Sequence, residues 1–280
     1  LIFSQTSSGL REVGKPFLKW VGGKRALVPE IRRYMPAHFD RYFEPFMGGA
    51  ALFFDTAPDK AYLSDVNAEL VNCYHMVKEK PEALIAALEA HYYDKDYYYH
   101  IRDLDRVPAE FAQLSDIERA ARLLFLNRAG FNGMYRVNRK GQFNVPFGRY
   151  ANPDLVKADA IRQASILLQK ADITHAPFTD MVDRARQGDF VYFDPPYVPL
   201  SQTANFTSYA QDDFTIADQQ ALANACIRLD EKGVHFMASN SFHDVVKDLY
   251  QGFEIVELKA RRAINSRADK RQAVSEALIS

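Results

Sequence analysis

The chain has 280 residues, of which 48% are hydrophobic and 25% are charged, an ordinary composition for a globular protein with a full core. Its formal net charge of −1 excludes a globally basic nucleic-acid binder. No basic segment precedes a long apolar run, and no window of about 18 apolar residues exists, so we expect neither a signal peptide nor a membrane span. Cys73 and Cys226 lie far apart in apolar sequence. They are expected to be core residues in a reduced cytoplasm and not a disulfide or a metal site.

Two short strands are expected in the first part of the chain. Residues 1–14 are polar and are expected to form a loose leader. The apolar stretch 41–46 predicts a strand that ends in two glycines, and 61–64 predicts a second strand that ends at Asp65. Asn67 is suited to cap a helix that follows this second strand.

The middle of the chain interrupts the pattern of alternating strands and helices. Residues 81–128 have apolar side chains at helical spacing, whereas 130–150 are rich in Gly, Asn and aromatic residues and are too irregular for a helix. The length of the chain suits two domains, or one large domain with an insertion. We therefore predict a mainly helical domain over 80–150, inserted between the two parts of a catalytic domain, 1–79 and 151–280.

Regular alternation returns after residue 150. The predicted elements are a helix over 161–170, a strand over 189–193 that ends at Asp194, a helix over 216–232 closed by Gly233, and strands over 234–238 and 253–258. Strands that alternate with helices in this way predict a parallel α/β sheet.

Positive charge is concentrated in two segments. Residues 127–149 contain no acid and five cations, which are Arg128, Arg136, Arg139, Lys140 and Arg149. Residues 259–271 contain six cations against Asp269 alone. Two basic segments on a neutral protein favour a basic face that binds phosphates, although two solvated surface loops would look the same in the sequence.

Glycines and an acid follow the first two predicted strands. Gly48 and Gly49 come after the first strand, and glycines there let a ligand approach the backbone closely. Asp65 lies 17 residues after Gly48, at a spacing common for acids that bind ribose hydroxyls. The Gly-x-Gly-x-x-Gly pattern of dinucleotide binding is absent, which favours a nucleoside without a pyrophosphate, usually S-adenosylmethionine. The Gly-Gly turn alone is equally compatible with a plain structural turn.

The segment Asp194-Pro195-Pro196-Tyr197 follows an apolar strand and is suited to methylate an exocyclic amine. The lone pair of such an amine is delocalised into the ring, so the amine is a poor nucleophile. The Asp194 carboxylate and the Pro195 carbonyl can accept hydrogen bonds from its two N–H groups and localise that pair, while the prolines hold both acceptors rigidly. Tyr197 can stack on the base. The motif alone leaves adenine N6, cytosine N4 and glutamine open as acceptors, and a strand followed by two prolines can also be a mere sheet terminator.

The residues that several other classes of reaction require are missing from this sequence. Carbon methylation of cytosine needs a thiolate, usually after a proline, but Cys73 follows Asn72 and Cys226 follows Ala225. The His-x-Glu and Cys-x-x-Cys motifs of zinc deaminases are absent, as are Gly-x-Ser-x-Gly and the P-loop.

These residues together resemble the DNA adenine-N6 methyltransferases, specifically the Dam enzymes that act on GATC. The resemblance covers 16–278 and rests on motifs in the order of the α group of amino-methyltransferases. The matching motifs are Phe17-Leu18-Lys19-Trp20-Val21-Gly22-Gly23-Lys24, Glu44-Pro45-Phe46, Leu63-Ser64-Asp65-Val66-Asn67, Asn127-Arg128, Asn144-Val145-Pro146-Phe147-Gly148-Arg149-Tyr150, Asp194-Pro195-Pro196-Tyr197 and Thr203-Ala204-Asn205-Phe206-Thr207.

The resemblance implies a Rossmann-like methyltransferase sheet and a set of cofactor contacts. Lys24 would bind the methionine carboxylate of S-adenosylmethionine, Asp65 the ribose and Phe178 the adenine. The full implied cofactor set is Trp20, Lys24, Glu44, Phe46, Gly48, Gly49, Asp65, Phe178 and Asp194. Asp194, Pro195 and Tyr197 would be catalytic, and no metal is implied.

The resemblance also implies contacts to double-stranded DNA. Phe131 would wedge into the duplex beside the target, Lys19 would contact the first guanine, and Arg136 would grip another guanine. The full implied set is Lys19, Arg128, Phe131, Asn132, Met134, Arg136, Arg139, Pro146, Asn205 and Tyr209, the last two in a loop that closes over the extruded adenine. Arg136 reading guanine O6 and N7 would supply about 1–3 kcal/mol of discrimination. A phosphate contact, which carries no sequence information, is the alternative.

Three positions depart from the family pattern. Ala50 stands where a third glycine is expected, and Met134 and Tyr135 differ from the expected Dam residues. Recognition of the third and fourth bases is therefore less well defined by the sequence.

The resulting hypothesis is a cytoplasmic monomer, nucleoid-associated or phage-encoded, that flips an adenine out of duplex DNA. It would transfer the methyl group in line from S-adenosylmethionine, without a covalent intermediate or a metal. An RNA adenine or protein glutamine methyltransferase is the rival enzyme, but neither explains the insert. A regulator that kept the fold and lost catalysis is the rival of a different class.

Overall fold

The computed structural model describes residues 2–6, 9–197, 214–261 and 273–280. A seven-stranded sheet lies at its centre, in the order β5-β4-β3-β6-β7-β9-β8. The strands are β3 (Tyr42–Glu44), β4 (Ala61–Asp65), β5 (Ala171–His175), β6 (Phe190–Phe193), β7 (His235–Ser241), β8 (Ile255–Arg261) and β9 (Ala273–Ile279). Strands β3 to β7 pair in parallel, whereas β9 is antiparallel to its neighbours β7 and β8. The sheet is therefore mostly parallel, with one antiparallel strand that the sequence did not predict.

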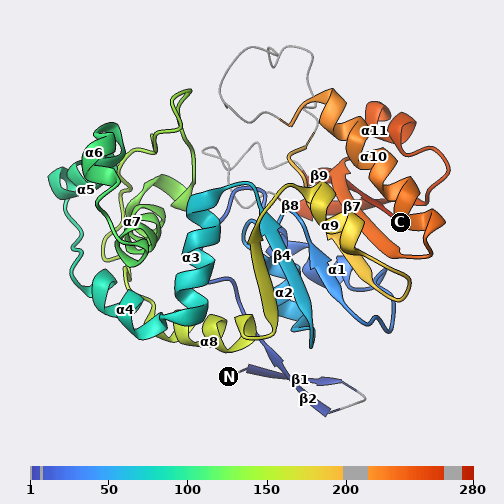
Figure 1. The fold of residues 1–280 in the computed structure, drawn as a ribbon, viewed down its shortest axis with the longest axis horizontal. Coiled ribbons are helices and arrows are strands. Elements are labelled where there is room, and N and C mark those ends of the chain that lie inside the picture. Colours follow the sequence, from blue (N-terminus) through green and yellow to red (C-terminus); the bar gives the residue numbers. More distant parts are fainter. Residues whose placement is uncertain (1, 7–8, 198–213, 262–272) are drawn as a thin grey trace.

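Helices cover both faces of the sheet (Figure 1). One layer contains α1 (Val28–Ile31), α2 (Ala51–Thr56), α3 (Ala68–Glu79) and α8 (Ala158–Leu168), and the other contains α9 (Phe178–Arg184), α10 (Ile216–Glu231) and α11 (Asp244–Leu249). Successive strand residues point to opposite layers, so Tyr42 belongs to the first core and Phe43 to the second. Every residue of β3 and β6 is buried, as expected for parallel strands that are covered on both sides.

The predicted strands that carry the site motifs are confirmed, with small shifts of their ends. Asn67 caps α3, because its side chain accepts a hydrogen bond of 3.1 Å from the Leu70 amide. Cys73 and Cys226 are both free and buried, which confirms that they are core residues. Strands β5 and β9 were not predicted.

The expected loose leader is wrong for the described residues at the N-terminus. Strands β1 (Ile2–Thr6) and β2 (Gly9–Val13) pair antiparallel, with Ile2 opposite Val13, and form a separate two-stranded sheet. Backbone pairing requires only extended chain, so a polar composition does not prevent it.

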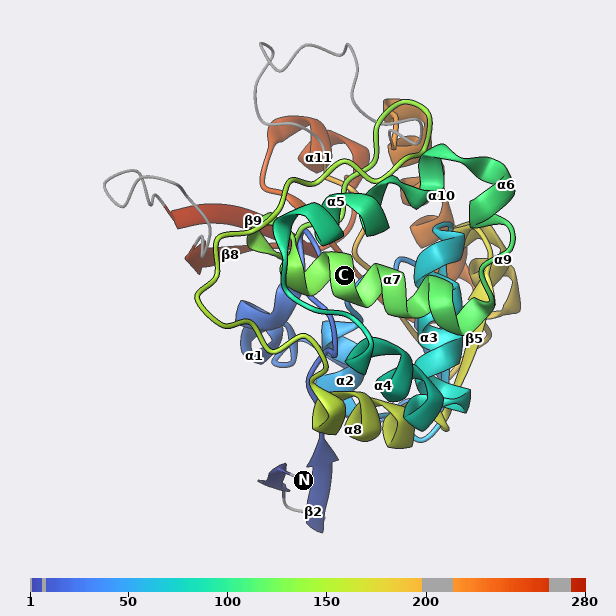
Figure 2. The same cartoon turned by 90° about the vertical axis from the view of Figure 1, so that its left-hand side faces the viewer.

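The middle of the chain is helical up to Ala129. It contains α4 (Pro81–Glu89), α5 (Lys95–Asp103), η2 (Leu104–Arg106), α6 (Pro108–Phe111) and α7 (Asp116–Ala129). Ser115 begins α7 with a capping box that includes Glu118. In Figure 2, α7 runs across the centre of the view between α5, α4 and α3, and it packs against all three. Its apolar side chains join the core that also contains α3 and α8. Within the described residues, no helix is long and apolar enough to span a membrane.

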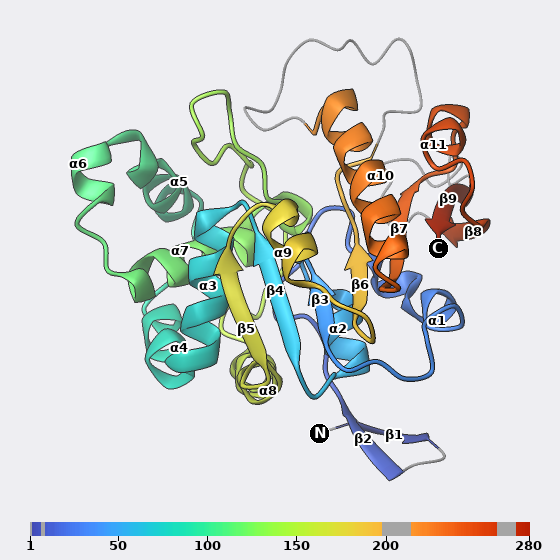
Figure 3. The ribbon, with the colours of Figure 1, turned by 45° about the vertical axis from the view of Figure 1, so that its right-hand side comes forward.

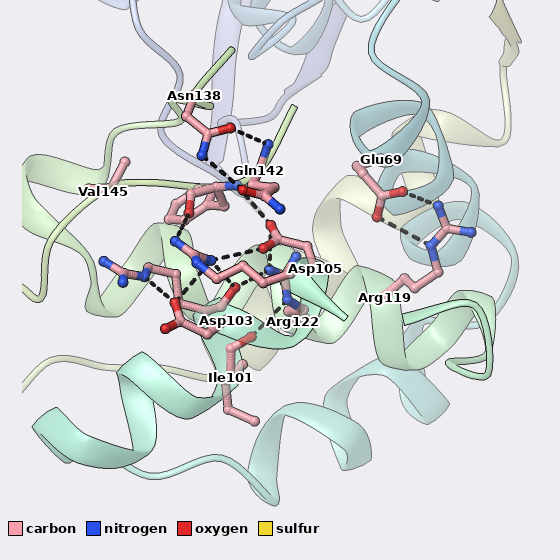
Figure 4. Close-up of polar contacts among 12 residues, drawn as sticks. Glu69, Ile101, Asp103, Asp105, Arg119, Arg122, Asn138, Gln142 and Val145 are labelled. Carbon is pink, nitrogen blue, oxygen red and sulfur yellow. Dashed lines mark hydrogen bonds and ion pairs between the residues drawn. The ribbon is translucent and has the colours of Figure 1, made fainter. Parts of the chain in front are cut away.

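The segment after α7 is irregular, as predicted, apart from η3 (Phe131–Gly133) and two isolated bridges, Gly130 to Phe147 and Val137 to Phe143. Charged side chains from the preceding helices hold it (Figure 4). Asp105 accepts a hydrogen bond of 2.7 Å from the Phe143 amide and pairs with Arg122 at 2.9 Å. The helices therefore fix the base of this loop, although it contains little regular structure of its own.

Candidate active site

The strand order reverses between β3 and β6. The chain runs outward from β3 through β4 to β5, and then returns to place β6 on the other side of β3. In open α/β sheets, ligands bind at such a reversal, outside the carboxyl ends of the strands. Figure 3 shows β4, β5 and β6 pointing toward one edge, where the green loop after α7 also lies. The three predicted site segments follow β3, β4 and β6 and therefore meet at this edge.

The glycine turn after β3 is tied to the acid at the end of β4. The Gly48 amide donates to Asp65 Oδ2 at 3.1 Å, and the Asn67 amide donates to Oδ1 at 3.0 Å. Burial raises the pKa of Asp65, and these backbone bonds partly oppose the rise. Gly48 has a φ of 44°, and a Cβ there would lie 2.7 Å from Trp20 Cδ1, so both conformation and space require glycine. Ala50 also adopts a positive φ, 46°, at the position where the family pattern has glycine.

Glu44 lies at the end of β3 and is 2% exposed. Burial raises its pKa to about 8, although the Tyr42 hydroxyl donates to Glu44 Oε2 at 2.8 Å and opposes the rise. Its carboxyl group is therefore mainly protonated at neutral pH. A neutral carboxyl can both donate and accept hydrogen bonds.

Aromatic rings converge beside the same turn. Phe46 and Phe178, which follow β3 and β5, stack with their centroids 5.4 Å apart. Phe214 meets both rings edge to face, at 5.5 Å from Phe46 and 6.2 Å from Phe178. Trp20 stacks on Tyr135 at 4.9 Å, so it contacts both the glycine turn and the irregular segment.

Asp194 lies at the end of β6 in a cluster of charged side chains. Lys24, from η1 (Lys24–Ala26), is 5% exposed, and its Nζ lies 2.8 Å from Asp194 Oδ1 and 3.7 Å from Glu276 Oε2. Tyr197 donates to the same Glu276 oxygen at 2.8 Å, and Lys24 Nζ lies 4.5 Å from the centre of its ring. Burial raises the pKa of Asp194, while Lys24 acts in the opposite direction.

A pair of amides holds the proline segment. Gln219 Nε2 donates to the Pro196 carbonyl at 2.8 Å, and Asn240 Nδ2 donates to Gln219 Oε1 at 2.9 Å. Gln219 and Asn240 are both buried. Strand β7 and helix α10 therefore position the turn that contains Asp194 and Pro195.

The residues expected to contact DNA lie mainly on the irregular segment. Asn127 joins this segment to Lys19, because its side chain bonds both the amide and the carbonyl of Lys19 (3.0 and 2.8 Å) and the carbonyl of Gly133 (2.8 Å). Phe131 is 47% exposed although it is a large apolar side chain. Asn132, Met134, Arg139 and Pro146 lie on the same segment, and Pro146 accepts a hydrogen bond from the Phe131 amide.

Arg136 is held at one side of its guanidinium group. Its Nε donates to Asn144 Oδ1 at 2.6 Å, and its Nη2 donates to the Asn144 carbonyl at 3.0 Å. A guanidinium has five N–H groups, so these two bonds leave the Nη1 end available for a ligand.

Arg128 occupies a different environment from the other arginines of the segment. It is 8% exposed and donates to the carbonyls of Leu155 and Val156, both at 2.7 Å, and of Phe17 at 3.1 Å. Burial lowers its pKa to about 10. We expected Arg128 to contact DNA because it lies in a basic segment. Its guanidinium instead bonds to backbone carbonyls inside the protein and is not presented on the surface. The expected residues Asn205 and Tyr209, and most of the second basic segment, lie outside the described residues.

Four side chains of the site were missed by sequence reasoning: Phe214, Gln219, Asn240 and Glu276. None of them belongs to a motif, and Glu276 lies on the unpredicted strand β9. In the described part of the chain, no group of three or more His, Cys, Asp and Glu side chains could hold a metal ion.

A mostly parallel seven-stranded sheet with an Asp-Pro-Pro-Tyr turn at its reversal point is consistent with the methyltransferases. Residues 20–264 match the D12 class N6 adenine-specific DNA methyltransferase family, and the chain belongs to that family. It is therefore an adenine-specific DNA methyltransferase.

Relatives match along nearly the whole chain. The type II methyltransferase M1.LlaDCHI of Lactococcus lactis subsp. cremoris is 44% identical over 269 residues, which are 95% of this chain and 94% of the relative. The DNA adenine methylases of Serratia marcescens and Escherichia coli K12 are 37% and 35% identical. These two alignments cover 94% of this chain, and 97% and 94% of the relatives.

Proposed function

We propose that the enzyme methylates the adenine of GATC in duplex DNA and that Asp194 is the centre of its active site. The observation that carries this proposal is the position of Asp194. It lies directly after β6 and is partly buried, with Lys24 Nζ at 2.8 Å from its carboxylate and Tyr197 in the same turn. Relatives named DNA adenine methylase that match along 94% of the chain support adenine in DNA as the acceptor, and the resemblance to the Dam motifs supports GATC as the site.

The site fits S-adenosylmethionine by the chemistry of its side chains. Asp65 offers carboxylate oxygens to ribose hydroxyls, Lys24 offers an ammonium to the methionine carboxylate, and Phe46 with Phe178 offers aromatic faces to the adenine. We propose that Trp20, Glu44, Gly48 and Gly49 complete the cofactor site. S-adenosylmethionine supplies a methyl group on a sulfonium, which is a good leaving group.

The residues around Asp194 would then activate the amine. The Asp194 carboxylate accepts a hydrogen bond from one N–H of adenine N6, and the Pro195 carbonyl accepts one from the other. Because Asp194 is partly buried, little water competes for its oxygens, which strengthens a hydrogen bond to its carboxylate. Tyr197 stacks on the base, and the Gln219 and Asn240 side chains keep the proline turn in place. Positioning and polarisation are sufficient for this transfer.

The region 80–150 would recognise the DNA. We propose that Arg136, held by Asn144, directs its Nη1 end to a guanine, and that the exposed Phe131 enters the duplex beside the flipped adenine. Lys19, Asn132, Met134, Arg139 and Pro146 complete the proposed surface on the described residues, and Asn205 and Tyr209 are proposed to close over the adenine. Arg128 is left out, because it is itself buried and its guanidinium donates to backbone carbonyls of the protein.

The test is methylation of a randomised duplex pool by the purified chain, followed by mapping of N6-methyladenine. We expect the methylated adenines to lie in GATC. When S-adenosylmethionine is omitted, no methylated adenine is expected. A different consensus sequence would contradict GATC as the recognition site. The base pair at which it departs from GATC would show which proposed base contact is wrong. Sedimentation of the enzyme with and without a single-site duplex tests the further expectation that it acts as a monomer.

A further inference from the structure

We propose that Glu276 is a positioning residue that retains Lys24 and Tyr197 while Asp194 leaves its ion pair with Lys24 and turns to the target amine. This inference rests on the function proposed above. Glu276 belongs to none of the motifs recognised in the sequence, and this role would make it part of the active site.

Lys24 has more carboxylates around it than its own charge requires. Its ammonium has three N–H donors, and it is 5% exposed, so each donor needs an acceptor inside the protein. The Gly22 carbonyl lies at 2.7 Å and Asp194 at 2.8 Å, while Glu276 lies at 3.7 Å. One buried ammonium therefore has two carboxylates beside it, one more than charge neutrality requires.

The Asp194 carboxylate has to serve two partners in the proposed reaction. One of its two oxygens, Oδ1, is bonded to Lys24 in this structure, and an ammonium that shares the charge of the carboxylate weakens it as an acceptor for adenine. If Asp194 were the only carboxylate near Lys24, releasing it before the cofactor binds would leave a buried ammonium without a counter-charge, which is strongly unfavourable. Glu276 removes this cost, because the ammonium keeps one carboxylate and offers the released donor to the methionine carboxylate of the cofactor.

The same Glu276 oxygen also holds Tyr197. Tyr197 donates to Glu276 Oε2, which also faces Lys24. Glu276 lies on an interior strand, where its backbone is paired with Ser241 of β7 and with Leu258 of β8. A side chain on a strand fixed from both sides can keep the tyrosine ring and the ammonium in place while Asp194 changes partner.

The decisive experiment is a double-mutant cycle on cofactor binding. S-adenosylmethionine is titrated by calorimetry into the wild type, Glu276→Gln, Asp194→Asn and the double variant. Gln keeps an acceptor for Tyr197 but removes the charge that faces Lys24. In the wild-type background, Glu276→Gln is expected to raise Kd roughly tenfold, since Lys24 then stays with Asp194. In the Asp194→Asn background, where this competitor is gone, the same change is expected to raise Kd by no more than about threefold. Equal fold-changes in both backgrounds, or no change in either, would overturn the proposal.

Turnover gives a second readout with a matched control. On a GATC duplex, Glu276→Gln is expected to lower kcat roughly tenfold and to change KM for DNA less. Glu257→Gln makes the same chemical change at an exposed position of the neighbouring strand β8 and is expected to leave kcat unaltered. A wild-type kcat in the Glu276 variant would contradict the positioning role. Thermal unfolding midpoints establish that each variant is folded, and Glu276→Asp, which retracts the carboxylate, replaces Gln in the cycle if that variant does not fold.

The two proposals fail in different ways. The binding cycle does not depend on which base is methylated, so a consensus other than GATC leaves its result valid. Conversely, an additive cycle together with normal GATC methylation refutes the role of Glu276 alone.

Discussion

Replacing Glu44 by Gln is expected to stabilise the enzyme at neutral pH. The unfolded chain releases the Glu44 proton near pH 4.5, whereas the folded protein retains it up to about pH 8 because the carboxyl is buried. Between these two values the unfolded state is favoured by proton release, so stability falls as the pH rises. Each pH unit in this window costs about 1.4 kcal/mol, which amounts to about 3 kcal/mol at pH 7. Gln cannot ionise and removes this cost.

Urea unfolding of the wild type and Glu44→Gln at several pH values between 5 and 8 measures the effect. The difference in the free energy of unfolding is expected to grow in favour of Gln by about 1.4 kcal/mol for each pH unit up to pH 7, and to level off above pH 8. Lost packing or a weaker hydrogen bond to Tyr42 would change the free energy of unfolding by the same amount at every pH, so it would not alter the dependence on pH. Glu110→Gln, at an exposed position, is the control and is expected to give a difference near zero at every pH. A difference for Glu44→Gln that does not change with pH would refute the reasoning.

Three further changes test the site. Asp194→Ala is expected to lower methyl transfer to a GATC duplex roughly 100-fold or more while calorimetric binding of S-adenosylmethionine persists, and normal turnover would contradict the mechanism. Arg136→Ala is expected to relax discrimination at one guanine by about 1–3 kcal/mol in pool sequencing, whereas uniform weakening on all sequences would identify a phosphate contact. Gly48→Ala is expected to destabilise the protein by roughly 1–3 kcal/mol in urea, because the added methyl meets Trp20 and the positive φ disfavours it; an unchanged midpoint would rule out this strain.

The parts of the site that could be predicted from the sequence are those encoded by consecutive residues. Asp194 ends an apolar strand and Asp65 ends another, and the carboxyl ends of parallel strands meet at one edge of a sheet. Knowing that these segments are strands was therefore enough to bring their side chains together. The Asn67 cap was predictable for the same reason, because its partner lies three residues away.

The residues that could not be predicted depend on distant parts of the chain. Glu276 meets Tyr197 across 79 residues, because the antiparallel β9 lies between β7 and β8. No local pattern indicates that insertion. Arg128 shows the opposite problem: a run of cations indicates a basic segment, but the sequence does not show which of them the fold buries. Its guanidinium donates hydrogen bonds to the carbonyls of Phe17 and Val156, which lie far from each other in the sequence.

The Asn127 side chain also bears on how enzymes of this kind diverge. It bonds Lys19 and Gly133, and Lys19 is followed directly by Trp20, which packs against the glycine turn. With the roles proposed above for Lys19 and Trp20, a substitution that moves this contact would alter base preference and cofactor affinity together. Under the same proposal, new recognition sequences would evolve most readily through the exposed side chains beyond Gly133, where a change in the base that is read would leave the methyl-donor site intact.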